Sequence, residues 1–444
     1  MPEFSHSASS VARGHIVAPI QPIRAASVGG GLGLAGIAIA TIAGLIAPFA
    51  GLIAMLTLLV STAVLGFSER YLRSDPHQLG FALKVLGIVG ATLLFLLADN
   101  MIMIAAGWIA SGLIMAQLIG HVQGWDEACA ARRRALKQFL LGDMALVAAL
   151  AILALDTGSL SVASPGPNGT AQSAVALLLV LAACVRCALP PFSRWLTRSM
   201  AAPTPVSALM HAGFVNAGGV LLVRFGPLLE QAPAAQLVAI AAGSFAALWG
   251  TAVMWVRPDV KRSLAGSTVA QMGFMVMSCG LGAYAAAAFH LIAHGLFKAW
   301  LFLSSGSAIG RPQIAGVRSP VRSLLLGAVA ALAACSLTLW TSGSLPPPTI
   351  LPSILAVATA AASVPLLFRS GSAIAVGILL LLLYACGVQL MTFALERPVG
   401  SPPAGNWLAA CLLAMFGTAW LIQHRLLDAG RNLPAFLHAR LLNS

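Results

Sequence analysis

Apolar stretches as long as a lipid bilayer is thick follow one another along almost the whole chain. A transmembrane helix needs about 20 mainly apolar residues, and hydropathy predicts about 14 such segments in this sequence. Just 8% of the 444 residues are charged, whereas a soluble domain carries about 25% charged residues to cover its water-facing surface. The sequence therefore predicts an all-α polytopic membrane protein and excludes a soluble enzyme and a disordered chain. The predicted spans are 27–47, 49–67, 81–98, 100–121, 138–156, 173–191, 204–225, 234–256, 263–283, 286–309, 321–341, 348–368, 371–393 and 405–425.

The segments outside these spans define the expected domain organisation. Residues 1–26 contain Ser, His and two Arg without a compact apolar core, so we expect a tail and not a cleaved signal. Residues 27–425 form one transmembrane domain, and 426–444 form a second tail.

The basic residues are distributed unevenly over the predicted loops. Of the 25 Lys and Arg, 21 fall on the side that carries both termini, two fall on the other side, and Arg186 and Lys298 fall within spans. The positive-inside rule then predicts that both termini are cytoplasmic. The net charge of +13 is a signal of topology and not a nucleic-acid-binding surface. The densest basic loop, RRRALK at 132–137, could bind anionic lipid head groups or a cytoplasmic partner.

Metal and disulfide chemistry are weakly indicated. Seven cysteines are an odd number, and most lie in or beside apolar segments, where cysteine packs as a small hydrophobic residue. Cys184 and Cys187 form a CxxC without a second pair or a histidine cluster nearby, so we expect no zinc site in this chain.

Several ionisable residues fall within predicted spans or at their ends. A charge at the bilayer centre costs at least ~2.5–3.5 kcal/mol on insertion scales, so each such residue is a functional candidate. The aspartates near span ends could instead serve capping or topology. These residues, which we take as candidates for an ion path, are Asp99, Asp143, Arg186, His211, His290, His294 and Lys298.

The segment FHLIAHGLFKAW places three of these residues on one helical face. His290, His294 and Lys298 are four residues apart in turn, which separates them by about 6 Å per step. Histidine titrates near neutral pH and a lysine out of water releases its proton more easily, so the stripe could pass protons. A single intramembrane histidine more often serves an interhelical hydrogen bond. Zinc binding by the two histidines lacks a third ligand in this helix.

Helix breaks are expected beside two of the candidates. Arg186 lies in CVRCALPPF, where Pro190 and Pro191 end a helix and free backbone carbonyls. His211 ends the segment PTPVSALMH, which opens the next span.

These motifs carry a family resemblance over about residues 65–310. They resemble the antiporter-like subunits shared by respiratory complex I and Mrp-type cation/proton antiporters. The resemblance implies inverted repeats of five helices, each with a broken helix, and a central chain of Lys, His and Glu that carries protons. It matches His211, the His290–His294–Lys298 stripe and Asp143 to functional positions of the family. The segments concerned are PTPVSALMHAGFVNAGGVLLV, DVKRSLAGSTVAQMGFM, FHLIAHGLFKAWLFLSSGS, LADNMIMIAAGWIASGL and LKQFLLGD.

The sequence also departs from the family pattern. Arg186 stands where the family has a pivotal lysine, and arginine keeps its proton at biological pH. Ile109 in WIASGL stands where the family has the glutamate of WEGxGL. No lysine follows Lys298, and the predicted span 321–341 has no Lys or Glu. We therefore expect an incomplete antiporter pathway.

One branch of the family departs in a similar way, the membrane subunits of DAB-type inorganic-carbon accumulation complexes (DabB-like). This resemblance implies a large cytoplasmic zinc β-carbonic-anhydrase-like partner (DabA-like), so that ion flow energises CO2 hydration to bicarbonate. Zinc and catalysis would belong to the partner, and we expect no cofactor and no catalytic residue in this chain. The shortness of the chain, the lost glutamate and the retained stripe favour this branch. The alternatives are a complex I, hydrogenase or Mrp-type antiporter subunit and a non-conducting membrane anchor. Histidine and lysine favour a proton over Na⁺, because neither offers the oxygen ligands of hard cations.

Overall fold

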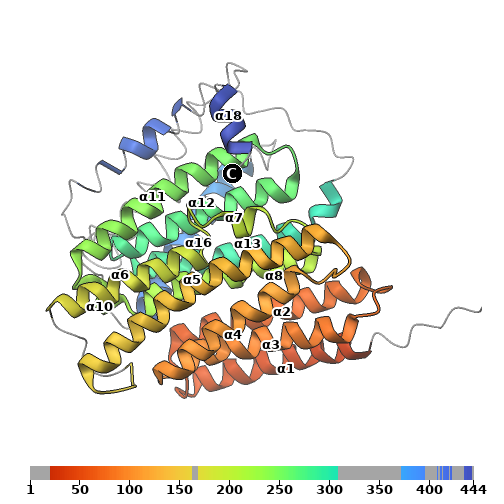
Figure 1. The fold of residues 1–444 in the computed structure, drawn as a ribbon, viewed down its shortest axis with the longest axis horizontal. Coiled ribbons are helices and arrows are strands. Elements are labelled where there is room, and N and C mark those ends of the chain that lie inside the picture. Colours follow the sequence, from red (N-terminus) through yellow and green to blue (C-terminus); the bar gives the residue numbers. More distant parts are fainter. Residues whose placement is uncertain are drawn as a thin grey trace, which may run out of the picture.

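The computed structural model describes residues 21–162, 169–308, 372–395, part of 408–422, and 435–442. Almost all of these residues are helical, and the long helices run roughly parallel to one another (Figure 1). The predicted spans 321–341 and 348–368 and most of the two predicted tails lie outside the described residues. The elements are α1 (Gln21–Ile42), α2 (Pro48–Tyr71), α3 (Gln78–Leu97), α4 (Met101–Ile119), α5 (Asp126–Thr157), α6 (Gly169–Arg186), α7 (Arg194–Thr197), α8 (Thr204–Ala212), η1 (Phe214–Asn216), α9 (Ala217–Arg224), α10 (Gly226–Glu230), α11 (Pro233–Val256), α12 (Val260–Gly280), α13 (Tyr284–Leu303), η2 (Ser305–Ala308), α16 (Ser372–Leu395) and α18 (Ala435–Leu442).

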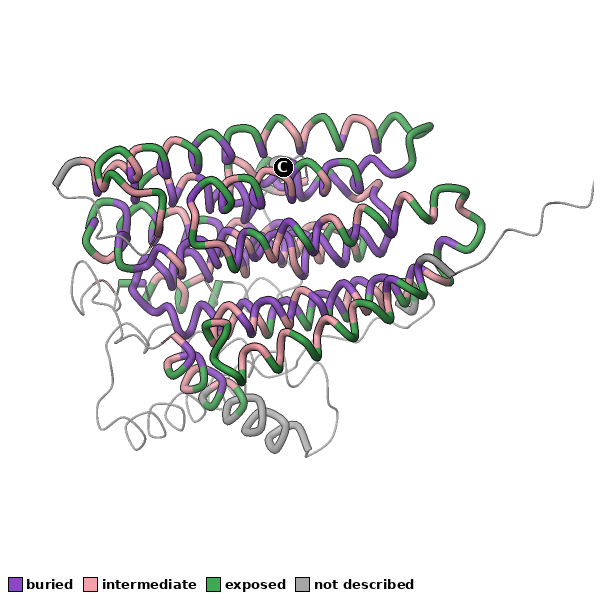
Figure 2. Tube along the Cα trace, turned by 90° about the horizontal axis from the view of Figure 1, so that it is seen from below, coloured by how far each residue is buried: buried purple, intermediate pink, exposed green. Residues whose placement is uncertain are grey.

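Within the described ranges, eight segments are long and apolar enough to cross a membrane. They include the long helices α2 to α5, the α8–α9 segment, α11 and α13. This arrangement confirms the prediction of an all-α multi-pass membrane protein. Buried positions follow the inward faces of these helices and exposed positions their outward faces, as Figure 2 shows.

The RRRALK segment was predicted to be a loop, and this prediction is wrong. Residues 132–137 lie inside α5, which begins at Asp126, twelve residues before the predicted span. Ala, Arg, Leu and Lys are all good helix formers, and Asp126 and Glu127 in the first turn favour a helix start at this point. Hydropathy detects only the apolar part of a helix, so it does not detect the basic turns by which α5 extends beyond the predicted span.

Small residues bring α11 and α12 into close contact. A Cβ built on Gly250 of α11 would lie 2.3 Å from the backbone nitrogen of Ala270 in α12. A Cβ on Gly273 of α12 would lie 2.6 Å from the nitrogen of Ala247. Close backbone approach through small residues is the usual way in which helices associate in a membrane. The two helices are therefore tightly packed, and α13 packs against α12 of this pair.

Two interruptions occur where the sequence predicts breaks. The helix α6 ends at Arg186, and the chain resumes helical structure with the four residues of α7. The predicted span 204–225 is divided: α8 ends before Gly213, and η1 connects it to α9. Both interruptions lie beside candidate residues, so broken helices position the ionisable groups.

Candidate ion path

Arg186 is buried at the end of α6 and is held by three oxygen acceptors. Its side chain donates to the Ser111 hydroxyl at 3.0 Å, to the Trp108 carbonyl at 3.0 Å and to Asp143 Oδ1 at 3.3 Å. Arg186 is 1% exposed and Asp143 is 8% exposed. A buried cation needs a counter-charge and satisfied donors, and this set provides both. Asp143, a candidate from the sequence, thus lies beside Arg186.

Aromatic rings enclose the guanidinium from the sides. The Arg186 Cζ lies 3.9 Å from the ring centroid of Trp108, 4.5 Å from that of Phe214 and 5.5 Å from that of Phe139. Such stacking stabilises a cation in a site without bulk water. Trp195 of α7 packs against two of these rings and donates to the Val185 carbonyl at 3.0 Å. The short helix α7 thus closes the arginine site.

The WIASGL motif contacts Arg186 through positions other than the one that has changed. Trp108, Ser111 and Gly112 face the guanidinium, and a Cβ on Gly112 would lie 3.5 Å from it. Ile109 is partly buried against the hydrophobic core. The counter-charge of Arg186 therefore comes from Asp143 on α5, and α4 contributes neutral oxygens.

Lys298 is the second buried cation. It lies on α13, is 1% exposed, and donates from Nζ to the Leu264 carbonyl of α12 at 2.9 Å. Among the described residues, no carboxylate lies within ion-pair distance of it. An ammonium group held by a neutral carbonyl can lose its proton without breaking an ion pair, which suits a proton carrier.

His211 is connected to Lys298 through α12. Its Nδ1 lies 3.0 Å from the Thr268 hydroxyl, which donates to the same Leu264 carbonyl at 3.0 Å. Because the hydroxyl proton points to Leu264, Nδ1 carries the proton of the neutral ring and Nε2 is the acceptor. Nε2 has no hydrogen-bond partner among the described residues. The ring stacks on Phe302 with centroids 4.3 Å apart.

The two α13 histidines continue the stripe away from Lys298. Their ring centroids are 5.9 Å apart, with the ring planes 17° from parallel. Both nitrogens of His294 and Nε2 of His290 are buried without a hydrogen-bond partner in the described part of the chain. No group of three His, Cys, Asp or Glu close enough to hold a metal ion occurs within the described residues. The structure thus brings together the three stripe residues and His211.

The break between α8 and α9 joins the two cationic centres. Asn216 of η1 donates to the Ala212 carbonyl at 2.7 Å and to the Leu291 carbonyl of α13 at 3.3 Å. A Cβ on Gly295 of α13 would lie 2.8 Å from the Ala212 carbonyl, so a glycine is needed for this approach. Phe214, two residues before Asn216, faces Arg186 instead.

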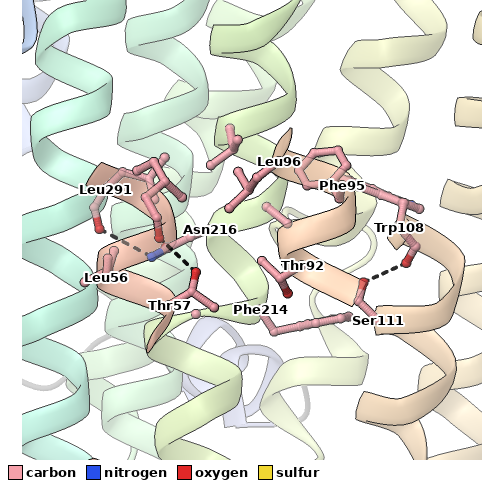
Figure 3. Close-up of a pocket in the computed structure, with 14 residues that line it drawn as sticks. Leu56, Thr57, Thr92, Phe95, Leu96, Trp108, Ser111, Phe214, Asn216 and Leu291 are labelled. Atoms are coloured by element: carbon pink, nitrogen blue, oxygen red, sulfur yellow. Dashed lines mark hydrogen bonds between the residues drawn. The ribbon is translucent and has the colours of Figure 1, made fainter. Parts of the chain in front are cut away.

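An internal cavity of about 30 Å³ lies beside this break. Figure 3 shows Trp108 and Ser111 on one side of the cavity and Asn216 and Leu291 on the other. The hydroxyl residues Thr57 and Thr92 also line it, and Asn216 Oδ1 has no partner within the described residues. The wall is mainly apolar, but its four polar side chains and its volume suit one or two ordered waters. The arginine site and α13 therefore border a common small cavity.

Asp99 lies apart from the other candidates. It stands between α3 and α4, where it accepts from the Ser161 hydroxyl. Nearby, Arg224 donates to the Phe95, Leu96 and Ala98 carbonyls at the end of α3. These contacts support a helix end, and they bring Asp99 to none of the stripe residues. Its assignment to the path stays a prediction.

Sequence reasoning missed the neutral groups of the site. Ser111 binds Arg186, Thr268 binds His211, and Asn216 binds the backbone of α8 and α13. The one feature of the sequence that could have indicated them is a polar side chain, a hydroxyl or an amide, inside a predicted span. The contact with the Leu264 carbonyl could not be predicted, because every residue has a backbone carbonyl.

Broken helices and a buried His–Lys stripe are features that the sequence resemblance implies, and Arg186 occupies the position of the family's lysine. Residues 98–347 match the family described as NADH:quinone oxidoreductase/Mrp antiporter, transmembrane. The match covers more than half of the chain, and the chain belongs to this family of antiporter-like membrane subunits. The predicted family is thereby confirmed.

Individual relatives come from two branches. A Bacillus anthracis protein named probable inorganic carbon transporter subunit DabB is 39% identical over 272 residues, 60% of this chain and 53% of the relative. NADH-quinone oxidoreductase subunit L of Mycobacterium tuberculosis is 38% identical over 251 residues, 55% of this chain and 40% of the relative. The chain spans about half the length of the curated relatives it matches. A solved Mrp complex from a Dietzia species aligns with a TM-score of 0.57 and 27% identity, over 83% of this chain and 42% of the other.

Proposed function

We propose that this chain is the ion-conducting membrane subunit of an inorganic-carbon accumulation complex. It conducts protons through the bacterial cytoplasmic membrane, with both termini in the cytoplasm. This flow energises CO2 hydration to bicarbonate by a large cytoplasmic partner that resembles a zinc β-carbonic anhydrase. The zinc and the catalytic groups belong to that partner. The similarity to proteins named inorganic carbon transporter subunits supports the assignment to this branch.

The observation that carries proton conduction is the environment of Lys298. The ammonium group is buried, is bound to a neutral carbonyl and stands in one hydrogen-bonded chain with His211. The Thr268 hydroxyl and the Lys298 ammonium both donate to the Leu264 carbonyl, which accepts and has no proton to pass on. Thr268 is therefore a positioning residue that holds the His211 ring beside the acceptor of Lys298, and His294 and His290 extend the path along α13.

Arg186 has a different role in this proposal. Its guanidinium keeps its proton, so it acts as a fixed positive charge whose field is set by Asp143. A proton that approaches the break meets this charge through the small cavity between Ser111 and Asn216. Arg186 then controls access to the α13 stripe and carries no proton itself.

Proton flux into liposomes that contain the purified native complex tests the role of Lys298. We expect Lys298→Ala to abolish the uncoupler-sensitive pH change while the complex still assembles. Lys137→Ala is the matched control, because Lys137 is an exposed lysine on α5. Full flux in Lys298→Ala would refute the proton path, and loss of flux in both variants would point to a general defect.

Purification from native membranes in mild detergent, with mass spectrometry and zinc analysis, tests the partner. A single large soluble zinc protein supports the inorganic-carbon assignment. Several other multi-span subunits, or iron–sulfur and flavin proteins, would refute it.

The second candidate is an antiporter subunit of a complex I, hydrogenase or Mrp-type assembly. The M. tuberculosis relative and the Mrp structure favour it. A non-conducting anchor is a third candidate, which Ile109 in place of the family glutamate favours. An anchor predicts partner binding without flux, so the flux and purification experiments together separate all three.

A further inference from the structure

A second cavity lies at one end of the helices, away from the ion path. Its volume is about 280 Å³, much larger than one water needs. It is formed where the first turns of α5 meet the α7–α8 connection, the α11–α12 connection and α18. We call it the arginine pocket. Its lining residues are Glu127, Ala130, Arg134, Thr197, Arg198, Met200, Ala201, Arg257, Arg262 and Leu442.

The charged residues around the arginine pocket are mainly basic. Within the described part of the chain, four of its lining residues are arginines, and Glu127 is the one carboxylate among them. A second carboxylate, Asp259, contacts the rim arginine Arg262 at 3.6 Å. Burial lowers the pKa of Arg257, and Arg262 and Arg198 lower it further, whereas Asp259 opposes the shift. The guanidinium groups therefore repel one another, and an oxyanion between them would relieve that repulsion.

The pocket lies at the end of α5 that precedes its apolar part. Leu141 is exposed and lies two turns after Arg134 on the same face of α5. Seven residues of α-helix rise about 10 Å, and the head-group layer on each side of a bilayer is about 5–8 Å thick. With Leu141 against the edge of the acyl region, Arg134 reaches the head groups on the side predicted to be cytoplasmic.

The apolar part of the lining distinguishes a lipid from a free ion. Ala130, Met200, Ala201 and Leu442 line the pocket together with the arginines, and α18, which carries Leu442, packs against α11 (Figure 1). A free phosphate ion has no apolar part to place against these side chains. A glycerophospholipid carries a phosphodiester, a glycerol backbone and the first methylenes of its chains. Basic pockets between helices on the cytoplasmic side are typical sites for anionic head groups.

We propose that the arginine pocket binds the phosphodiester head group of an anionic phospholipid, with the guanidinium groups of Arg134, Arg198, Arg257 and Arg262 as the ligands. Guanidinium matches the phosphate oxygens in planar, two-pronged hydrogen bonds. The bound lipid joins the α5, α7 and α11–α12 ends of the bundle. This site is independent of proton conduction and of the identity of the soluble partner.

Lipid binding to the purified full chain in detergent micelles tests this site. Phosphatidylglycerol is the probe, and phosphatidylcholine and inorganic phosphate are the references, with retention measured by native mass spectrometry. We expect Arg134→Gln and Arg257→Gln each to weaken phosphatidylglycerol binding about tenfold, because each removes charge-assisted hydrogen bonds. Arg133→Gln is the matched control: it removes the same charge from the neighbouring residue of α5, which is exposed and does not line the pocket.

The outcomes are distinct. The site is supported if Arg134→Gln and Arg257→Gln lose phosphatidylglycerol binding, Arg133→Gln keeps it, and the parent chain binds phosphatidylcholine weakly. Equal loss in Arg133→Gln, or equal binding of both lipids, would overturn it. Inorganic phosphate that binds as tightly as phosphatidylglycerol would show that the pocket takes a free phosphate ion and not a lipid head group. An acidic protein that copurifies with the parent chain and is lost with Arg134→Gln would overturn both the lipid and the free-ion assignment. If Arg257→Gln does not fold, Arg134→Gln decides, since Arg134 is partly exposed.

Discussion

Asp143→Leu is the substitution that most directly tests how the membrane interior accommodates Arg186. It removes the one carboxylate that contacts the guanidinium among the described residues, and leaves the Ser111 and Trp108 acceptors and the three aromatic rings in place. Arg186 cannot lose its proton as a compensating response. A positive charge then remains buried without its counter-charge.

The expected cost follows from the contacts. Removal of one partner of a buried ion pair typically costs about 3–5 kcal/mol. The contact of 3.3 Å is long for a charged pair, and two neutral acceptors remain. We therefore expect the lower end of that range, about 3 kcal/mol of unfolding free energy. Replacement of both residues, in Arg186→Met with Asp143→Leu, removes the charge itself and should lie within about 1 kcal/mol of the parent protein.

The assay is reversible unfolding of the purified chain in mixed detergent and dodecyl sulfate micelles, followed by tryptophan fluorescence. The single variants, the double variant and the parent form a double-mutant cycle. Asp156→Leu is the matched control, because Asp156 is an exposed carboxylate at the end of the same helix. A double variant at least as unstable as Asp143→Leu alone would refute the assignment of Asp143 as the counter-charge.

Three further predictions follow from other contacts. Thr268→Val preserves the shape of the side chain but removes the hydroxyl that ties the His211 ring to the Leu264 carbonyl, the acceptor of Lys298, so we expect at least a tenfold lower proton flux with unchanged assembly, and Thr251→Val on α11 serves as the control. Gly295→Ala places a Cβ 2.8 Å from the Ala212 carbonyl and should cost about 1–3 kcal/mol of unfolding free energy, whereas Gly90→Ala, with open space around it, should be neutral. Between α2 and α3, burial alone would raise the pKa of Asp75, but the His77 backbone and the His121 side chain lower it below its ordinary value of 3.8. Asp75 then stabilises the fold above about pH 4, and this contribution disappears as the pH falls through the lowered pKa. Asp75→Asn should lower the free energy of unfolding at pH 7 by about 1 kcal/mol, and the difference should shrink progressively as the pH falls below about 4 and Asp75 becomes protonated; a constant difference across this range would contradict the assignment.

The sequence predicted the fold through properties that do not depend on partners. Bilayer thickness fixes the length of an apolar helix, so α2, α3, α4 and α11 begin and end within a few residues of their predicted spans. The prolines at 190 and 191 indicated the end of α6 for a local steric reason. By contrast, α5 extends beyond its span because helix-forming residues and the acidic first turn favour a helix in a stretch that hydropathy does not detect.

The candidate site could be predicted residue by residue but not as an assembly. Helical periodicity placed His290, His294 and Lys298 on one face, and the structure keeps them there. The pairing of Arg186 with Asp143 joins α6 to α5, and contact between helices depends on packing that periodicity does not encode. The Lys298 contact with Leu264 uses a backbone carbonyl, a group that every residue carries.

The three residues of η1 serve two neighbours at once. Phe214 contacts the guanidinium of Arg186, and Asn216 binds the backbone of α13 beside His294. Insertion or deletion of one residue between them would rotate the two side chains by roughly a third of a turn relative to each other, so that one contact would be lost when the other is kept. The length of this segment is therefore fixed more strictly than its composition, because a single turn of backbone positions a side chain at each of the two charged regions.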